Sequence, residues 1–241
     1  MQFLNGQDYI QQVSIDCVIF GYQKKQLKVL VPKLALKGDF SSLPGGFILQ
    51  NESIDQAARR ILQARTGLKD IYLEQFRVFG DLGRNNMPFF EQIVGLNQEQ
   101  QGAESFNRKE LEWITRRFIS IGYYALVDIH QVVPQKSEID QSIEWYTINE
   151  LPSLIMDHNQ IVDNALQSLR LSLDQKLIGF TLLPEIFTMK DLQELYETIY
   201  DKPFARNNFQ KKMLELDVLD RLEKKFTGAA NKAPYLYRFR K

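Results

Sequence analysis

Short apolar segments separated by polar turns dominate the first third of the chain and predict β-strands. Residues 13–20 and 27–34 flank GYQKKQ, where Gly21 and a polar run indicate a hairpin turn. Residues 43–49 place a Pro-Gly-Gly turn before another apolar stretch. Further strands are predicted at 71–79, 117–129 and 144–148.

Two helices are predicted from apolar residues at helical spacing. The first has one apolar face formed by Ile54, Ala57, Ala58, Ile61 and Leu62. Ser53 with Gln56 resembles a capping box, and Gly67 suits the C-terminal stop. The second spans 158–170, with Ile161, Ala165, Leu166 and Leu169 on one face. Residues 84–116 form a glutamine-rich insertion, expected to be a loop with a short helix.

The composition changes around 175–184, and we place a domain boundary there, giving domains 1–175 and 176–241. Beyond it, Thr188 is a plausible N-cap for a helix with Leu192, Leu195, Tyr196, Ile199 and Tyr200 on one face. A second helix is predicted at 206–218, with Phe209, Met213 and Leu216 facing inward. LEKKF and YLYRFR then form a hairpin, so the fold class is α+β.

Composition excludes disordered and fibrous proteins, because 44% of residues are apolar and 25% are charged. The net charge is zero, yet residues 202–241 contain 11 Lys and Arg against 4 Asp and Glu. This local excess of +7 suggests an anionic partner.

We expect a cytoplasmic protein. The single cysteine, Cys17, is interpreted as a buried apolar residue, and one cysteine cannot form an internal disulfide. No secretory signal and no membrane span is predicted.

The segment GGFILQNESIDQAARRILQARTGL resembles the Nudix box, the loop–helix–loop signature of enzymes that cleave nucleoside diphosphates linked to another moiety. The matching positions are Gly46, Glu52, Arg60, Leu62, Gly67 and Leu68. The resemblance implies an α/β/α sandwich with a mixed sheet.

The box lacks three of the family's glutamates: Ile61, Ala64 and Arg65 occupy their positions. Pyrophosphate cleavage needs a divalent cation held by several carboxylates. Glu52 is the only one retained, and Arg65 would repel a cation. We therefore expect a scaffold with no catalytic residue, metal or cofactor, in which Gly46 makes a tight turn, Arg60 pairs with an acid and Ile61 packs. The alternative is a relocated metal site using Glu74, Asp81 or acidic residues of the insertion.

Such a fold can still hold a sugar or a phosphorylated nucleoside between the sheet and the LPGG loop. The candidate effector-binding residues are Lys33, Ser41, Arg84 and Tyr124, which lie on or beside the expected cleft. For each of these residues the alternative to ligand contact is a structural role, as a solvated surface charge or a core tyrosine.

The second predicted helix of the C-terminal domain carries side chains suited to binding DNA. Asn207, Gln210 and Lys211 share an outward face, with Arg206 nearby, and such side chains pair with base edges or phosphates. Lys224, Lys225, Lys232 and Arg238 lie along the predicted hairpin, where phosphate contacts are expected. The alternative is a solvated helix with a basic tail.

Over almost its whole length the chain resembles the Nudix-related transcriptional regulators. That family includes ADP-ribose-sensing repressors of NAD metabolism and L-arabinose-sensing regulators of gut Bacteroidetes. SIDCVIFGY, SIGYYAL and IGFTLLPEIFT look closer to the arabinose type. The resemblance implies a homodimer on a palindromic double-stranded operator, with a sugar (L-arabinose-like) or nucleotide-sugar effector. The insertion departs from compact members and leaves the effector open. Two alternatives are a Nudix hydrolase acting on ADP-ribose, and a sensor whose winged helix pairs with a protein.

Overall fold

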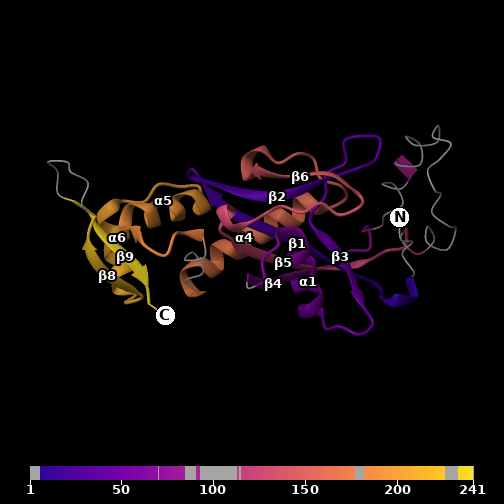
Figure 1. The fold of residues 1–241 in the computed structure, drawn as a ribbon, viewed down its shortest axis with the longest axis horizontal. Helices are drawn as coiled ribbons and strands as arrows, with labels where there is room; N and C mark the ends of the chain where they lie inside the picture. The colour runs from indigo at the N-terminus through magenta and orange to yellow at the C-terminus, as the bar shows by residue number, and fades with distance from the viewer. Residues whose placement is uncertain are drawn as a thin grey trace.

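The computed structural model shows an elongated molecule with two sheets, one at the centre and a smaller one at one end (Figure 1). The residues that it describes are 6–69, 71–84, 91–92, 113, 115–176, 182–225 and 233–240. Most of the predicted insertion therefore lies outside the described residues. Among the described residues, no helix combines the length and the apolar character that crossing a bilayer requires.

The first two strands, β1 (Tyr9–Gln23) and β2 (Gln26–Leu34), form the predicted hairpin. The turn residues are Lys24 and Lys25, both with positive φ, so the turn lies in the polar run of the predicted GYQKKQ segment and not at Gly21. Gly21 lies inside β1, where a Cβ atom would come within 2.3 Å of the Ile129 Cγ1 atom. That glycine allows the short helix η2 (Ile129–Gln131) to approach the strand.

The central sheet is mixed, as predicted, with the strand order β4-β5-β1-β2-β6 and β3 paired to β1. Its other strands are β3 (Gly45–Leu49), β4 (Tyr72–Phe79), β5 (Ile119–Val127) and β6 (Asp140–Thr147). β1 and β5 run parallel, and every other pairing is antiparallel. All the predicted strands of this domain are confirmed, with shifts at their ends.

One helix covers each face of this sheet, which makes the α/β/α sandwich. Ile15, Cys17 and Ile19 pack with α1 (Ile54–Thr66), while the alternate side chains of β1 pack towards α4 (His158–Lys176). Successive strand residues point to opposite faces, so one strand serves both layers. Cys17 is fully buried and burial raises the pKa of its thiol, in keeping with an apolar packing role.

Local capping confirms the predicted ends of α1. The Ser53 side chain accepts from the Gln56 amide, and the Gln56 side chain accepts in return from the Ser53 amide. Gly67 closes the helix with φ at 74°, a left-handed conformation that glycine adopts without strain.

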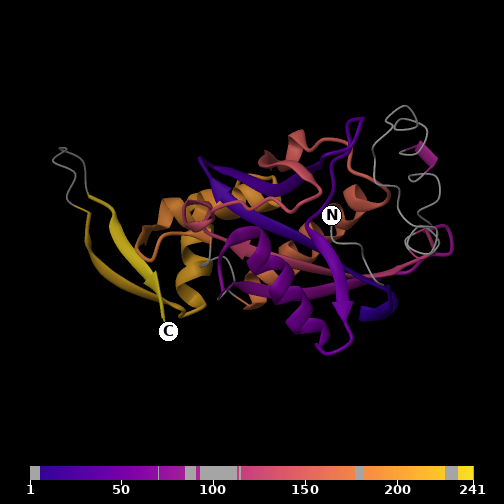
Figure 2. The same ribbon diagram turned by 45° about the vertical axis from the view of Figure 1, so that its right-hand side comes forward.

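The C-terminal domain follows the winged-helix order (Figure 2). α5 (Met189–Tyr200) begins at the predicted Thr188 cap, and α6 (Arg206–Glu215) follows. β7 (Phe187–Thr188), β8 (Leu219–Lys224) and β9 (Tyr235–Phe239) form the three-stranded sheet.

The helix predicted at 206–218 ends three residues early. Phe209 and Met213 are buried as expected, but Leu216 is 38% exposed. The reason is that Asp217 has positive φ, which turns the chain from α6 into β8 before Leu216 can face inward.

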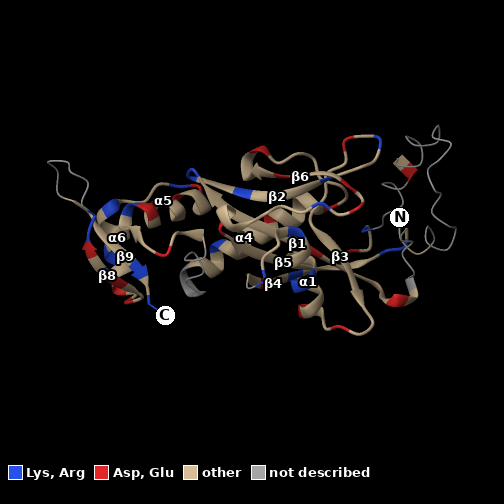
Figure 3. Ribbon diagram, viewed as in Figure 1, with Lys and Arg blue, Asp and Glu red and all other residues tan. Residues whose placement is uncertain are grey.

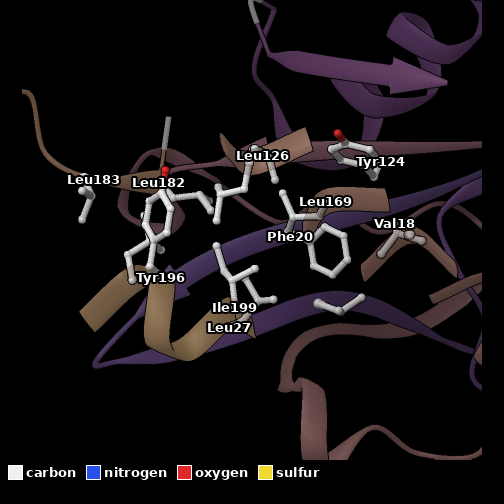
Figure 4. Close-up of a cluster of buried hydrophobic side chains, with 14 of the residues drawn as sticks. Val18, Phe20, Leu27, Tyr124, Leu126, Leu169, Leu182, Leu183, Tyr196 and Ile199 are labelled. Carbon is white, nitrogen blue, oxygen red and sulfur yellow. The ribbon is translucent and has the colours of Figure 1, made fainter. Parts of the chain in front are cut away.

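A continuous apolar core joins the two domains (Figure 4). Leu126 of β5 and Leu169 of α4 belong to the same cluster as Leu182, Tyr196 and Ile199 of the C-terminal domain. α4 runs to Lys176, and 177–181 lie outside the described residues, so the boundary at 175/176 stays a prediction.

Candidate functional sites

The retained Nudix-box carboxylate, Glu52, lies in the loop before α1 and is held by an arginine of that helix. Arg60 donates from Nε to Oε2 of Glu52 at 2.9 Å and from Nη2 to Oε1 at 2.6 Å. The Leu49 amide donates to Oε1 at 2.8 Å, and Arg60 also donates to the Phe47 carbonyl at 2.9 Å. The Arg60 hydrogen bonds keep the pKa of Glu52 below its ordinary value. The pair therefore ties the loop after β3 to α1, as the scaffold prediction requires.

The other box positions have become part of the core. Ile61 is buried, and a Cβ atom at Gly46 would lie 3.1 Å from its Cδ1 atom, so the glycine admits the isoleucine. Arg65 is buried and ion-paired with Asp140, whose Oδ2 atom also accepts from the Ser137 amide and hydroxyl. The expectation that Arg65 repels a cation is wrong, because its charge is compensated inside the fold.

The residues that the structure describes do not fit the divalent cation that the fold family implies. Within the described ranges, no three His, Cys, Asp or Glu side chains gather closely enough to hold a metal ion. Glu74 accepts hydrogen bonds from the Tyr72 and Tyr124 hydroxyls, and Asp81 is exposed. Neither residue belongs to a metal-binding group among the described residues, and the acidic residues of the insertion other than Glu91 lie outside them.

The four predicted effector residues differ in their burial and in their partners. Tyr124 is 0% exposed in the core on the α4 side, where burial raises the pKa of its phenol to about 12, so its prediction as a lining group is wrong. Lys33 pairs with Asp39 at 2.9 Å. Ser41 is buried and bridges Lys33 and Leu154 through its backbone.

Arg84 lies in a buried polar cluster at the start of α4 that the sequence reading missed. Its Nη2 atom lies 3.2 Å from Oδ2 of Asp16, its Nε atom lies 2.8 Å from Oδ2 of Asp157, and Nη1 donates to the Phe118 carbonyl at 3.1 Å. Asp16 also accepts from the Ser120 hydroxyl. The sequence does contain one signal of this cluster: Asp16 lies inside the apolar run VSIDCVIF. A carboxylate buried in such a strand needs a cation beside it.

His158 completes this cluster and connects it to the LPGG loop. Its Nδ1 atom accepts from the Leu43 amide at 3.0 Å, and its Nε2 atom lies 3.7 Å from Oδ1 of Asp16. Burial lowers the pKa of the imidazole, although Asp16 opposes that shift. A neutral His158 therefore joins β1, the loop before β3 and the first turn of α4.

The outer face of α6 carries the residues predicted to form a recognition surface. Asn207 and Lys211 are exposed, Gln210 is half-buried, and all three line a shallow groove with Leu214 and Glu215. Arg206 is the first residue of the helix and is exposed. Lys211 lies 3.8 Å from Glu215, an exposed pair that little constrains the ammonium.

Figure 3 marks Lys and Arg positions on α6 and on the hairpin. The neighbours of the hairpin cations differ: some are carboxylates and others are aromatic rings. Arg238 pairs with Asp220 at 3.2 Å, and Arg240 pairs with Asp217 and Asp220. Arg221, which the sequence reading missed, stacks with its Cζ atom 3.3 Å from the Tyr235 ring centroid, and Lys224 lies over the same ring at 5.2 Å.

For the remaining predicted hairpin residues, Lys225 is exposed and Lys232 lies outside the described residues. Within the described part of the chain, Arg221, Lys224 and Lys225 have no carboxylate partner within ion-pair distance, so these hairpin cations are available to phosphate. Arg238 is half-exposed and shares Asp220 with Arg240, so its charge is partly balanced, and a phosphate contact by Arg238 stays a prediction.

Fold and sites together define a two-domain protein in which an α/β/α sandwich with a degenerate phosphohydrolase signature carries a winged helix. Comparison with known families matches residues 10–168 to the NUDIX domain, and the chain therefore belongs to the Nudix family. Residues 179–239 match the NrtR DNA-binding winged helix domain.

Individual relatives share this arrangement at low identity. The "ADPR responsive transcriptional repressor NtrR" of Acinetobacter baylyi is 24% identical over 234 residues, covering 94% of this chain and 81% of that protein. The structure of Shewanella oneidensis NrtR with a 27mer DNA is similar with a TM-score of 0.69 and 24% identity, over 95% of this chain and 94% of that one. A MutT/nudix family protein from Enterococcus faecalis has a TM-score of 0.69 and 16% identity, over 96% of this chain and 87% of that one. These likenesses confirm the fold of both domains.

Proposed function

We propose that this chain is an effector-responsive, DNA-binding transcriptional regulator whose Nudix domain senses a ligand and does not hydrolyse it. The observation that carries the proposal is the exposed face of α6, where Asn207, Gln210 and Lys211 stand beside a basic hairpin. Amide side chains suit adenine edges in the major groove, and lysine suits guanine or phosphate.

The local charge supports DNA over a protein partner. Residues 202–241 carry an excess of seven positive charges on an otherwise acidic chain. Phosphate contacts by such groups release counterions, so affinity should fall steeply with salt. The names of the Acinetobacter and Shewanella relatives, a repressor and a DNA-bound NrtR, point in the same direction.

The absence of catalysis is proposed from the box itself. Glu52 is engaged by Arg60, Ile61 is buried and Arg65 is paired with Asp140, so the described residues of the box offer no carboxylate cluster for hydrolysis. The competing function, a Nudix hydrolase acting on ADP-ribose, predicts metal-dependent turnover.

We further propose a cytoplasmic homodimer on a palindromic operator, controlled by a small sugar or nucleotide-sugar. L-arabinose and ADP-ribose are the two effectors to test, the second because the Acinetobacter relative is described as ADPR responsive. Shifting the DNA-competent population from 9:1 to 1:9 requires about 2.6 kcal/mol of differential binding, which a few hydrogen bonds supply.

A mobility-shift titration with the duplex upstream of the chain's own gene tests the proposal. We expect a specific complex that one effector changes, and we expect the double variant Arg206→Ala, Lys211→Ala to lose it while effector binding persists. Lys136→Ala, an exposed lysine of the Nudix domain, is the matched control and should behave as the parent protein. Unchanged DNA affinity in the double variant would remove the recognition helix from the proposal. Turnover of ADP-ribose with Mg²⁺ would favour the hydrolase.

A further inference from the structure

The β8–β9 hairpin has two faces that differ in their surroundings. Residues that pair directly across an antiparallel ladder point to the same face, and successive residues of one strand point to opposite faces. One face carries Leu219 and Tyr237, and both are buried. They belong to the same apolar cluster as Phe209 and Met213 of α6. We call this the inner face, because it packs into the core of the domain.

Farther along the hairpin, the inner face carries exposed cations. Arg221 is paired with Tyr237 on the ladder, and Lys224 is paired with Tyr235. The two tyrosines are two residues apart on β9, so they and their partners point the same way. Both cations are exposed, while Tyr235 is half-buried. In Figure 2 the hairpin continues beyond the helices of the domain, in agreement with this exposure.

A β-bulge in β8 makes this arrangement possible. Arg221 and Lys224 are three residues apart, a spacing that sends side chains to opposite faces of a regular strand. Their partners on β9 are only two residues apart, so β8 contains one extra residue between the two cations. Such a bulge re-aims the side chains that follow it. It brings Lys224 to the inner face, on the same side as Arg221.

The ring of Tyr235 lies beneath both cations. The Cζ atom of Arg221 lies 3.3 Å from the ring centroid, and the Nζ atom of Lys224 lies 5.2 Å from it. At so short a distance the planar guanidinium lies flat on the ring, and its N–H donors point outward in their own plane. Stacking therefore restrains the arginine and leaves its fork of donors open to a ligand.

The outer face of the hairpin is close to neutral. Arg238 lies opposite Asp220 on the ladder and pairs with it at 3.2 Å. Arg240 pairs with both Asp217 and Asp220, so two arginines face two aspartates. The two cations of the inner face have no carboxylate within ion-pair distance in the part of the chain that the structure describes. Of the two faces, the inner one therefore suits an anionic partner better.

We propose that the inner face is the DNA-facing side of the hairpin, and that Tyr235 is a positioning residue that holds Arg221 and Lys224 towards neighbouring phosphates. A guanidinium with free N–H groups fits a phosphate through two parallel hydrogen bonds, and the ammonium adds a point charge. The partner is duplex DNA, because the charge is complementary and α6 of the same domain presents the predicted recognition surface. The inference rests on the proposed function in this one respect.

Salt titrations of the full chain with the duplex upstream of its own gene test the role of Tyr235. Each phosphate contact contributes about −0.9 to the slope of log K against log salt, so the double variant Arg221→Ala, Lys224→Ala should reduce the slope by about 1.8. At fixed salt, Tyr235→Leu should weaken binding about two- to fivefold, as the loss of an exposed cation–π contact implies. Tyr235→Phe keeps the ring and should match the parent protein.

A double-mutant cycle separates positioning from a general structural role. If Tyr235 acts through the two cations, Tyr235→Leu should cause no further loss in the Arg221→Ala, Lys224→Ala background. An equal loss in both backgrounds would mean that Tyr235 acts through the fold, and the positioning role would be wrong. A loss in Tyr235→Phe as large as in Tyr235→Leu would assign the effect to the hydroxyl, which would also overturn it.

A second variant serves in case Tyr235→Leu does not fold. Arg221→Lys, at an exposed position, keeps the charge and removes the flat stack and the fork of donors. We expect it to weaken binding about two- to fivefold. Parent affinity in this variant would show that the stacked guanidinium has no special role, and the proposal would be wrong.

The same titrations distinguish failure of this inference from failure of the proposed function. If the parent forms the specific complex and the Arg221→Ala, Lys224→Ala variant keeps the parent slope, the hairpin face is wrong and the regulator stands. If the parent binds no duplex even at low salt, the proposed function fails and the inference fails with it. Lys136→Ala, an exposed lysine of the Nudix domain, is the control and should keep the parent slope.

Discussion

Arg65 of α1 and Asp140 at the start of β6 form a buried ion pair at the position where a Nudix enzyme carries a glutamate. The pair couples the box helix to an edge strand of the sheet, and Asp140 also fixes the turn before that strand through Ser137. Sequence comparison alone registers a lost carboxylate at this position. The structure shows that the arginine at this position forms a buried ion pair within the fold.

Removing one member of this pair should destabilise the fold. We expect Arg65→Ala to lower the free energy of unfolding by about 3–5 kcal/mol, because it leaves the Asp140 charge buried and unpaired. Urea denaturation followed by circular dichroism measures the change, with the exposed neighbour Arg59→Ala as control. A loss of less than about 1 kcal/mol would mean that water reaches Asp140 and that the pair is not a structural element.

Neutralising the retained box carboxylate should have little effect on regulation. Glu52 contacts Arg60 and the Leu49 amide, so Glu52→Gln removes a partly exposed ion pair worth about 0.2–1 kcal/mol of stability. We expect unchanged operator affinity in a mobility-shift assay. A hydrolase activity present in the parent and lost in this variant would show that Glu52 is catalytic.

Acid should weaken the fold through His158. Burial holds the pKa of His158 in the folded state below its ordinary 6.5, so the unfolded chain binds a proton first as the pH falls. This contribution is fully present above about pH 6.5 and declines as the pH falls from there towards the lowered folded-state pKa. We expect the melting temperature to drop between pH 7.5 and 5.5.

The two histidines of the chain provide the comparison for that experiment. His158→Asn keeps an acceptor for the Leu43 amide and cannot be protonated in this range, so its melting temperature should depend less on pH. His130→Asn alters an exposed residue and should follow the parent curve. Equal pH dependence in all three proteins would locate the acid sensitivity elsewhere.

Two arginines of the hairpin should differ in their contribution to DNA affinity. Arg221 is stacked on Tyr235 and Arg238 is paired with Asp220, so only Arg221 should contact a phosphate. Arg221→Ala should reduce the slope of log K against log salt by about 0.9, the value for one phosphate on duplex DNA. Arg238→Ala should leave that slope unchanged. The reverse result would mean that DNA displaces Asp220 from Arg238.

Repeating patterns in the sequence were enough to predict most of the fold. Alternating strands, the capping box at Ser53 and the cap at Thr188 are all local signals, and each is confirmed. Gly21 was misread because a glycine needed for close packing with Ile129 resembles a glycine needed for a turn. Leu216 was misread because periodicity does not show where a helix ends.

The sites were less predictable because they depend on pairings across the sequence. Nothing near Arg84 in the chain reveals that Asp16 and Asp157 enclose it, 68 and 73 residues away. From the sequence, Arg238 is predicted to be a phosphate ligand. The structure places Asp220, 18 residues earlier, beside it on the neighbouring strand. Tyr124 reads as a pocket residue until its face of the sheet is known.

The apolar cluster that joins Leu126 and Leu169 to Tyr196 and Ile199 has a consequence for dissecting the molecule. Neither domain could be cut away without exposing part of its neighbour's interior to water, and exposed apolar patches of this kind promote aggregation. Heating should therefore melt the chain in one cooperative transition. A destabilising substitution in the core of the Nudix domain should therefore reduce DNA binding, because it lowers the amount of folded protein. This should hold even where the substituted residue contacts neither ligand nor operator.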